Sequence, residues 1–360
     1  MKKINFRALF KERNSEIIDD FYKLTSFNGS MMDTEQRENF IIHRLPASAK
    51  KDEVGNISCT LGSGPVHICI ATGIDDGIFA SIDRRIKIYK KNLFGIGIID
   101  DIRLVILIKF LSVIEKEKLL KGLKITFLFH RGQNSNNEGL HYFLKNRTFD
   151  ICLTMNQHSV NRMGIKPLSY VHLRVHKNSG RKDPYFELCK MLYEIEKSTT
   201  DWHVMIKKLI HQGRKGIIPK MAFGDLLFSS PKLEPSFLIK KLKNYLKSTG
   251  ADFNIVQRIG PRANPMGGIL REFFESTVND IAKMEKITLL PIETGLPLDG
   301  SLINASGTPA FDMGLFTFSC GSIVEEEIIL PTVTLGTGIL YSMLEKISIA
   351  GEEILKHGKT

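Results

Sequence analysis

Cysteine is scarce in this chain of 360 residues, and long apolar runs are missing. The five cysteines stand far apart, at Cys59, Cys69, Cys152, Cys189 and Cys320. Their odd number and the lack of a Cys-x-x-Cys spacing argue against a disulfide framework and against a zinc knuckle. No apolar run approaches about 18 residues, and the start of the chain lacks the apolar stretch of a signal peptide. We therefore expect a cytoplasmic protein with reduced thiols and no membrane span.

Acidic residues are outnumbered, since 50 Lys and Arg against 39 Asp and Glu give a formal net charge of +11. A surplus of this sign can indicate a nucleic-acid or membrane partner. The basic residues are scattered, however. Only residues 84–91 (RRIKIYKK) interleave an aromatic residue with basic ones, in the alternation of an exposed strand. We expect neither nucleic acid nor a membrane as a partner, and keep a basic scaffold subunit associated with nucleic acid as an alternative.

The first 165 residues alternate between apolar strands and amphipathic helices. The spacing predicts a helix over 5–26 with a break near Asn14, and a second helix over 33–44. Strands 56–61 and 65–72 are predicted to pair as a hairpin across a Gly-Ser-Gly-Pro turn, and a shorter hairpin follows within 84–100. A buried helix from Asp100, strand 123–130, a short helix and strand 149–155 follow. This order predicts an α/β fold with a three-layer, mostly parallel sheet.

Residues 166–262 have a different pattern. A strand, a helix, an extended pair of strands over 216–230, a helix and a last strand form a compact α+β module. The α/β pattern resumes after it and ends in a closing helix from Val324. We therefore predict one α/β domain made of residues 1–165 and 263–360, with residues 166–262 inserted as a second domain.

Acidic residues gather where two of these elements begin or end. The segment ATGIDDGIFA (71–80) places Asp75 and Asp76 just after an apolar strand, which is typical of a site at the carboxyl edge of a sheet. An Asx-type turn is the simpler alternative. Asp100 and Asp101 could likewise be only an N-cap and a first-turn acid, and Glu325–Glu327 only helix-start charges.

Three motifs together resemble the co-catalytic di-zinc peptidases and deacylases, such as peptidase T, aminoacylase and succinyl-diaminopimelate desuccinylase. They are DEVGNISCTLGSGPVHICIATGIDD, FGIGIIDDIR and GTPAFDMGLF followed by EEEII. The resemblance runs from about Asp52 to the C-terminus. It implies a zinc-exopeptidase-like α/β domain, with residues 166–262 as a lid or dimerisation domain, and a homodimer formed through that lid.

The resemblance also implies two histidines, a bridging carboxylate, a glutamate and a further acid around two zinc ions. The aligned positions are Ile74, Asp76, Asp100, Gln133, Asn134, Asn156 and Ser322. Ile74 stands at the first histidine, and Asp76 at the acid that orients it. Asp100 stands at the bridging carboxylate. Gln133 and Asn134 stand at the adjacent glutamates that serve as general base and ligand, Asn156 at the next acid, and Ser322 or a neighbour at the last histidine.

Only Asp100 keeps a side chain that suits zinc, because amides and hydroxyls are poor zinc ligands. We therefore expect no catalytic residue, no metal and no cofactor. The expected function is that of a pseudo-hydrolase, whose interdomain cleft binds a peptide-like or acyl-amino-acid ligand or a protein partner. The alternative is a metal-dependent amidohydrolase or peptidase with a rearranged site. Its ligands would come from His130, His141 and His158 together with Asp76, Asp100 and Glu138.

Overall fold

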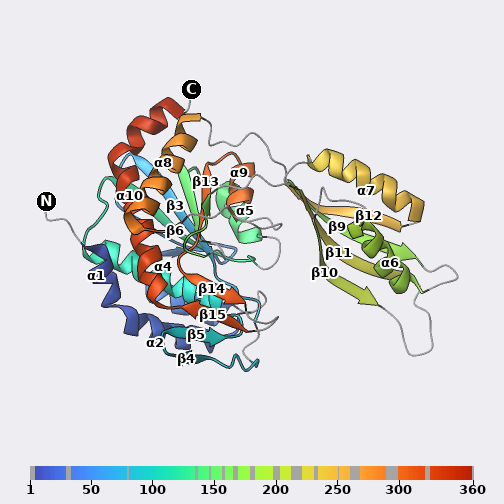
Figure 1. Ribbon diagram of the computed structural model, residues 1–360, viewed down its shortest axis with the longest axis horizontal. Helices are drawn as coiled ribbons and strands as arrows, with labels where there is room; N and C mark the ends of the chain where they lie inside the picture. Colours follow the sequence, from blue (N-terminus) through green and yellow to red (C-terminus); the bar gives the residue numbers. More distant parts are fainter. Residues whose placement is uncertain are drawn as a thin grey trace. The chain divides into compact units, whose positions relative to one another are not determined.

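A computed structural model gives the structure of the chain. It describes residues 5–29, 34–78, 81–133, 137–145, 147–155, 159–164, 169–178, 183–197, 203–211, 221–230, 234–249, 251–259, 268–288, 299–320 and 325–358. The chain divides into two compact units (Figure 1). The first comprises Met1–Ile165, Pro265–Ile292 and Ser306–Thr360, and the second comprises Lys166–Asn264 and Glu293–Ala305.

The first unit is built around a seven-stranded sheet in the order β1-β2-β6-β3-β7-β13-β8. These strands are β1 (Lys50–Lys51), β2 (Ile57–Leu61), β3 (Val66–Gly73), β6 (Leu123–His130), β7 (Ile151–Met155), β8 (Met163–Gly164) and β13 (Ala310–Met313). The central strands β6, β3, β7 and β13 are parallel to one another. Nearly every residue of β3 and β6 is buried, as expected where both faces of a parallel sheet are covered. The predicted mostly parallel α/β sheet is confirmed.

The predicted hairpin of strands 56–61 and 65–72 is wrong, because β6 lies between β2 and β3. The glycines of the turn instead let the start of β6 pass close to it. A Cβ at Gly62 would overlap the Leu123 carbonyl oxygen, and one at Gly64 would overlap that of Gly122. The turn is therefore rich in glycine because the start of β6 passes against it.

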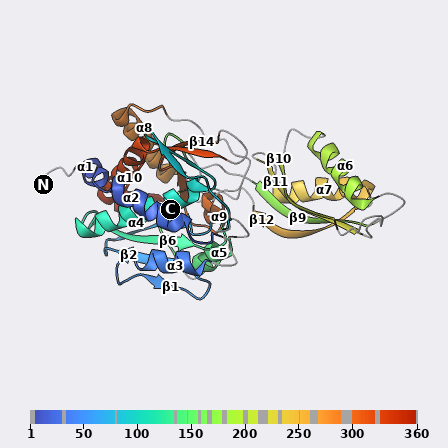
Figure 2. The same cartoon turned by 90° about the horizontal axis from the view of Figure 1, so that it is seen from below.

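Helices cover the sheet of the first unit. They are α1 (Phe6–Lys11), α2 (Asn14–Thr25), α3 (Glu35–Ile42), α4 (Ile98–Lys116), α5 (Glu138–Lys145), α8 (Gly268–Glu285) and α10 (Pro331–Gly358). Helices α4 and α10 contact β3, and α1 contacts both of them. Figure 2 shows α1, α2, α4 and α10 gathered together. Helix α4 is apolar nearly all round and lies almost wholly buried, as its sequence predicts.

A small antiparallel sheet completes the first unit, in the order β14-β15-β5-β4. Its strands are β4 (Lys87–Tyr89), β5 (Asn92–Gly95), β14 (Thr317–Cys320) and β15 (Glu326–Ile329). The short hairpin predicted within 84–100 is confirmed as β4 and β5. The closing helix predicted from Val324 begins later, at Pro331, which is a favourable first helical residue. Glu326 and Glu327 are therefore strand residues and not helix-start charges.

The second unit has its own four-stranded antiparallel sheet, in the order β10-β11-β9-β12. Its elements are β9 (Ser169–Asn178), α6 (Pro184–Lys197), β10 (His203–His211), β11 (Met221–Ser230), α7 (Pro235–Thr249) and β12 (Ala251–Ile259), and α9 (Asp299–Ala305) is grouped with it. Buried residues of both long helices and of the sheet form a separate core. The order of elements is the predicted one, but the first strand of the expected 216–230 pair lies earlier, at 203–211.

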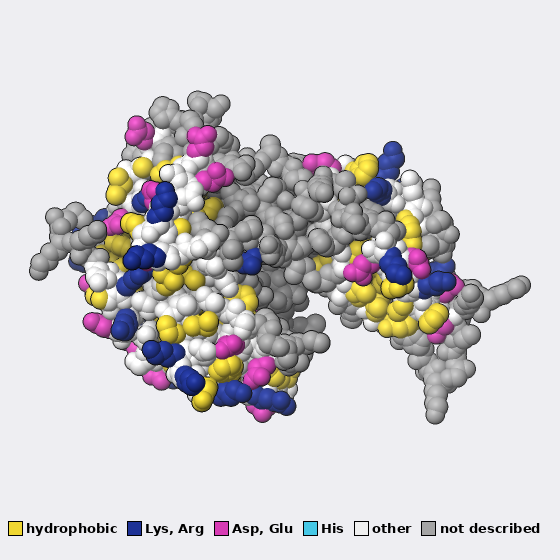
Figure 3. All heavy atoms as spheres, in the orientation of Figure 1, with side chains coloured by type: hydrophobic (Ala, Val, Ile, Leu, Met, Phe, Trp, Pro, Cys, Tyr) yellow, Lys and Arg dark blue, Asp and Glu magenta, His cyan; other side chains and the backbone are white. Residues whose placement is uncertain are grey.

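The surface agrees with the scattered charge of the sequence. On the face shown in Figure 3, Lys and Arg side chains are interspersed with Asp and Glu. Within the described ranges, no helix is long and apolar enough to cross a bilayer.

Candidate functional site

The carboxyl ends of β3 and β6 lie side by side, and backbone contacts join the loops that follow them. The Ile74 amide donates to the His130 carbonyl oxygen at 2.9 Å. The Asp75 carboxylate accepts from the amides of Gly132 at 2.8 Å and Gln133 at 3.1 Å. Asp75 is fully buried, so it acts as a structural acceptor that holds the second loop against the first.

Asp76 has two tasks. Its Oδ1 accepts from the amide of Ile78 at 2.8 Å, which is an Asx-type turn. Its Oδ2 binds Nη1 of Arg37 at 3.2 Å and Nη2 of Arg84 at 2.7 Å. Arg37 comes from α3, and Arg84 precedes β4. The Asx-type turn expected as the simpler alternative is therefore present at Asp76, and the same carboxylate also binds two arginines.

Asp101 binds the same two arginines. One of its carboxylate oxygens accepts from Nη2 of Arg37, and the other lies 2.6 Å from Nη1 of Arg84. We call Arg37, Arg84, Asp76 and Asp101 the Arg–Asp cluster. The side chains of Arg37, Asp76 and Asp101 are 0% exposed and that of Arg84 is 4% exposed. The cluster is therefore a buried network of two guanidinium groups and two carboxylates, joined by four ion pairs of which three are also hydrogen bonds.

Asp100 is paired with a third arginine. Its Oδ1 lies 2.6 Å from Nη2 of Arg103, one helical turn further along α4. The same Nη2 donates to Oε1 of Gln133 at 3.0 Å. Gln133 is held closely over the end of β3, because a Cβ at Gly73 would overlap its side chain. Arg103 thus joins the residue at the bridging-carboxylate position to the residue at the general-base position.

Glu326 caps the start of α4. Its Oε2 accepts from the amides of Ile98 at 2.7 Å and Ile99 at 2.9 Å, two of the donors left open at a helix N-terminus. The preceding Gly97 has a left-handed conformation, with φ of 62°. Burial raises the pKa of Glu326, with the nearby Asp100 acting in the same direction against the two amide hydrogen bonds. A carboxylate from β15 therefore occupies the anion-binding end of α4.

The buried position of the Arg–Asp cluster affects how its members ionise. Burial raises the pKa of Asp101 to about 7, against the pull of the Arg37 and Arg84 guanidinium groups. Burial opposes the charge of Arg37 too, but the carboxylates of Asp101 and Asp76 outweigh it and raise the pKa of that arginine. Arg37 therefore stays charged, while Asp101 exchanges its proton near neutral pH.

Four of the seven aligned positions lie in the described part of the chain, and it brings them close together. Asp100 and Gln133 share Arg103, and Ile74 and Asp76 share Arg37, whose Nε donates to the Ile74 carbonyl oxygen at 2.9 Å. Asn134, Asn156 and Ser322 lie outside the described residues, as does His158.

The sequence interpretation missed the three arginines and the roles of Asp101 and Glu326. Arg103 could have been found, because it follows Asp100 at helical spacing on one face. The alternation over 84–91 predicts an exposed strand, but Arg84 precedes β4 and is buried, with an exposed fraction of 5%. Arg37 carried no local signal, since it lies 39 positions from Asp76.

The described residues do not fit a zinc pair. Ile74 is buried and offers only its backbone, and Gln133 has an amide where a carboxylate would be needed. The carboxylates of Asp76, Asp100 and Asp101 all bind guanidinium groups. Across the ranges that the structure describes, no group of three or more His, Cys, Asp or Glu residues could hold a metal ion. His130, His141 and Glu138 belong to no such group within these ranges, and His158, the remaining histidine of the rearranged site, lies outside them.

No protein-family model matches the chain, and no curated protein matches it. Solved structures do match. The di-peptidase Dug1p from Saccharomyces cerevisiae is 12% identical with a TM-score of 0.71, over 95% of this chain and 98% of that one. Aminopeptidase PepT from Bacillus cereus is 13% identical with a TM-score of 0.63, over 93% and 98%. The YXEP protein of Bacillus subtilis, described as a dinuclear metal binding peptidase from the M20 family, is 12% identical with a TM-score of 0.62, also over 93% and 98%. The expected resemblance is confirmed for the fold: this chain has, over nearly its whole length, the α/β fold of the M20 peptidases.

Proposed function

We propose that the chain is a non-catalytic protein with a peptidase fold, which binds a peptide-like or acylated amino-acid ligand or a protein partner. The observation that carries the proposal is the Arg–Asp cluster. Its Asp76 stands at the acid that would orient the missing histidine, its Asp101 directly follows the bridging-carboxylate position Asp100, and both carboxylates are bound by two buried guanidinium groups.

Electrostatics supports this proposal. A divalent ion at Asp100, the bridging-carboxylate position, would have to displace Arg103 or lie beside it. Two unit charges about 4 Å apart repel by about 4 kcal/mol at an effective dielectric constant of about 20, and a divalent ion roughly doubles this. Displacing a buried guanidinium from its carboxylate costs about 3–5 kcal/mol. With Ile74 in place of a histidine, little donor strength offsets either cost.

The general-base position supports the same conclusion. A carboxylate there would accept a proton from water, whereas the Gln133 amide accepts no proton near neutral pH. Its oxygen already accepts a hydrogen bond from Arg103. Gln133 can still hydrogen-bond a neutral ligand, which suits binding without hydrolysis.

Zinc titration by calorimetry on the chelator-treated full-length protein tests the proposal, together with a screen of dipeptides and N-acyl amino acids with added zinc, manganese or cobalt. We expect no stoichiometric zinc uptake and no turnover. A Gln133→Glu variant is the matched control, and we expect it to stay inactive because a base alone does not supply a metal. Tight uptake of zinc that is lost in Asp100→Asn would contradict the proposal.

The same substrates without turnover serve as ligand probes in calorimetry. Binding of a dipeptide or an N-acyl amino acid that weakens in Gln133→Ala would support a small-ligand role at this edge of the sheet. Gln133→Ala removes the amide while leaving the Arg–Asp cluster intact. If no member of the panel binds, a protein partner is the part of the proposal that remains.

We also propose that the second unit mediates homodimer formation. Its helices expose large apolar side chains, with Phe186 at 70%, Tyr193 at 56% and Phe237 at 48% exposure. Exposed aromatic residues of this kind are enriched at protein interfaces. Sedimentation velocity on the wild type and on Phe186→Glu tests this, with the dimer expected to weaken in the variant. A wild-type monomer at all concentrations would contradict it.

A further inference from the structure

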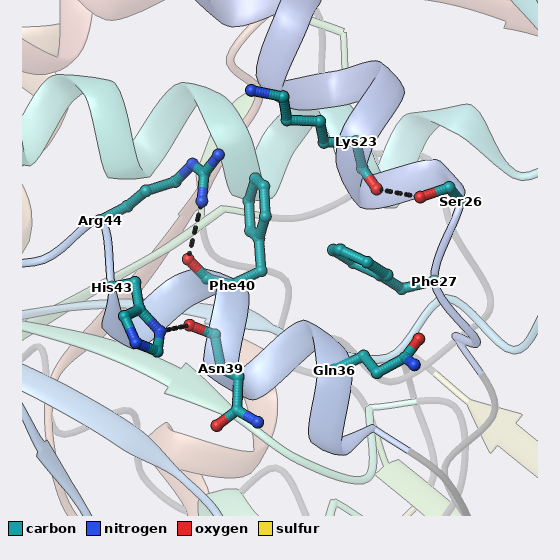
Figure 4. Close-up of a pocket in the computed structure, with 8 residues that line it drawn as sticks. All are labelled: Lys23, Ser26, Phe27, Gln36, Asn39, Phe40, His43 and Arg44. Atoms are coloured by element: carbon teal, nitrogen blue, oxygen red, sulfur yellow. Dashed lines mark hydrogen bonds between the residues drawn. The ribbon is translucent and has the colours of Figure 1, made fainter.

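A pocket of about 440 Å³ lies between α2 and α3, on residues that the candidate site does not use. We call it the α2–α3 pocket. It is lined by Lys23, Ser26, Phe27, Gln36, Asn39, Phe40, His43 and Arg44 (Figure 4). On α3 the lining positions follow helical spacing along one face. Arg37 of the same helix is not among the lining residues and belongs to the Arg–Asp cluster instead.

Two aromatic rings form the apolar part of the pocket. The centroids of Phe27 and Phe40 are 5.8 Å apart, with their planes inclined by 64°. Figure 4 shows the two rings between the helix that carries Lys23 and the helix that carries Gln36 and Asn39. The Arg44 guanidinium lies 3.5 Å from the centroid of Phe40. Because Phe40 is only 6% exposed, an apolar side chain entering here would pack mainly against the half-buried ring of Phe27.

The pocket wall is held in place by its own hydrogen bonds. Arg44 donates to Asp20 at 2.9 and 2.8 Å and to the Phe40 carbonyl oxygen at 3.3 Å. His43 Nδ1 lies 2.6 Å from the Asn39 carbonyl oxygen. A wall fixed before binding lowers the ordering cost of binding.

The charges around the pocket have one sign. Its three ionisable lining residues are Lys23, His43 and Arg44, and none of the lining residues is acidic. The Asp20 carboxylate neutralises the charge of Arg44. Within the described chain, no carboxylate forms an ion pair with the Lys23 ammonium group. The pocket therefore combines an apolar wall with the positive charge of Lys23 at its rim, which complements an apolar side chain flanked by carboxylates.

The exposure of the rim favours a segment of another protein over a small molecule. Lys23, Ser26, Gln36, Asn39 and His43 are all exposed, so the pocket opens widely to solvent. Small-molecule sites bury about 70–90% of their ligand, which a pocket this open does not do. A polypeptide segment can insert one side chain and place the rest of its contacts along the rim. We propose that the α2–α3 pocket binds an acidic segment of a partner protein, with one aromatic or aliphatic side chain packed against Phe27 beside the Phe27–Phe40 pair.

Fluorescence anisotropy with short labelled synthetic peptides tests this on the full-length protein. The probes are Asp- and Glu-rich peptides with one central Trp or Leu. One set of matched peptides has Lys in place of the acids, and another has Ala in place of the central residue. We expect the acidic peptides with an apolar residue to bind, more weakly as salt is raised, and both matched sets to bind about ten-fold or more weakly.

Two charge-reversal variants identify the surface. Lys23→Glu lies in the pocket, and Lys121→Glu changes the same charge at an exposed position outside it. We expect Lys23→Glu to weaken the acidic peptides by about ten-fold and Lys121→Glu by less than about two-fold. Circular dichroism confirms that both variants are folded. Equal effects of the two variants, or equal binding of acidic and basic peptides, would overturn the proposal. Binding of an isolated aromatic carboxylate such as indole-3-acetate as tightly as the peptides would also overturn it, in favour of a small-molecule site. Zinc uptake or hydrolysis at the candidate site would leave it unaffected.

Discussion

Arg37→Met is the substitution that most directly tests whether the Arg–Asp cluster holds the first unit together. Arg37 is fully buried and donates to the Ile74 carbonyl oxygen, to Asp76 and to Asp101. Methionine fills much of the same volume but removes the charge and every donor. Asp76 and Asp101 would then share Arg84 alone, and two buried carboxylates would face one guanidinium group.

The size of the effect follows from this imbalance. Removing one partner of a buried ion pair typically costs about 3–5 kcal/mol, which is a large part of a domain stability of about 5–15 kcal/mol. Arg13→Met is the matched control, since Arg13 pairs with Glu16 at side-chain exposures of 35% and 45%. An exposed pair of this kind contributes about 0–1 kcal/mol, so the control should stay close to the wild type.

A second substitution restores the balance of charge. Arg37→Met with Asp101→Asn leaves one carboxylate, Asp76, against one guanidinium group, Arg84. We expect this double variant to recover about 1–3 kcal/mol relative to the sum of the single changes.

Urea unfolding measures these differences, with hydrogen exchange of peptides from β3 and α4 as the readout specific to the first unit. A local readout is needed because two units can unfold separately. The reasoning is refuted if Arg37→Met costs no more than Arg13→Met, or if Asp101→Asn brings no recovery.

Three further predictions follow from the same geometry. The folded state holds the proton of Asp101 more tightly than the unfolded state, because its pKa is raised from 3.8 to about 7. The free energy that Asp101 contributes to stability should therefore fall as the pH rises through this range. In Asp101→Asn, the free energy of unfolding should lack this part of its pH dependence. Ile74→His should not create a zinc site, because Arg37 and Arg84 still occupy Asp76; stoichiometric zinc in calorimetry would contradict this. Gly64→Ala should destabilise the first unit by about 1–3 kcal/mol through overlap with the Gly122 carbonyl oxygen. Gly307→Ala is the control: its Cβ would meet nothing within 4 Å, so it should cost only about 1 kcal/mol, from the φ of +95°. If thermal unfolding shows Gly307→Ala to be more destabilising than Gly64→Ala, the close approach of β6 to the turn would be contradicted.

The elements of this fold could be predicted from local patterns, whereas their pairing could not. The apolar runs of β3 and β6 and the all-round apolar surface of α4 are properties of short segments. That β6 lies between β2 and β3 depends on contacts between segments about 70 residues apart, as between Cys59 and Phe127. A glycine-rich turn between two strands predicts a hairpin equally well when a third strand separates them.

In the candidate site, too, the positions of the acids could be predicted from local patterns, whereas most of their partners could not. Asp76 and Asp100 could be located because they follow a strand and open a helix. Their partners could not, except for Arg103, because Arg37 and Arg84 come from distant segments. Arg37 stands between two glutamates on α3, and Arg84 opens a basic run that looks solvent-exposed. A sequence pattern shows where buried acids are expected, but it does not show which cation neutralises them.

Under the proposed non-catalytic function, the isoleucine at position 74 and the buried arginines belong to one arrangement. Carboxylates as deeply buried as Asp76 and Asp101 cost several kcal/mol each unless a cation accompanies them. A guanidinium group supplies that charge together with five donors in a fixed plane, so it can also bind the backbone that a metal would leave open. Arg37 does so at the carbonyl oxygen of Ile74, the residue that stands in the place of a histidine. The isoleucine side chain packs into the core while its backbone completes the shell of the arginine. Ile74 is thus part of the shell of Arg37, and the two guanidinium groups balance the charge of the buried acids.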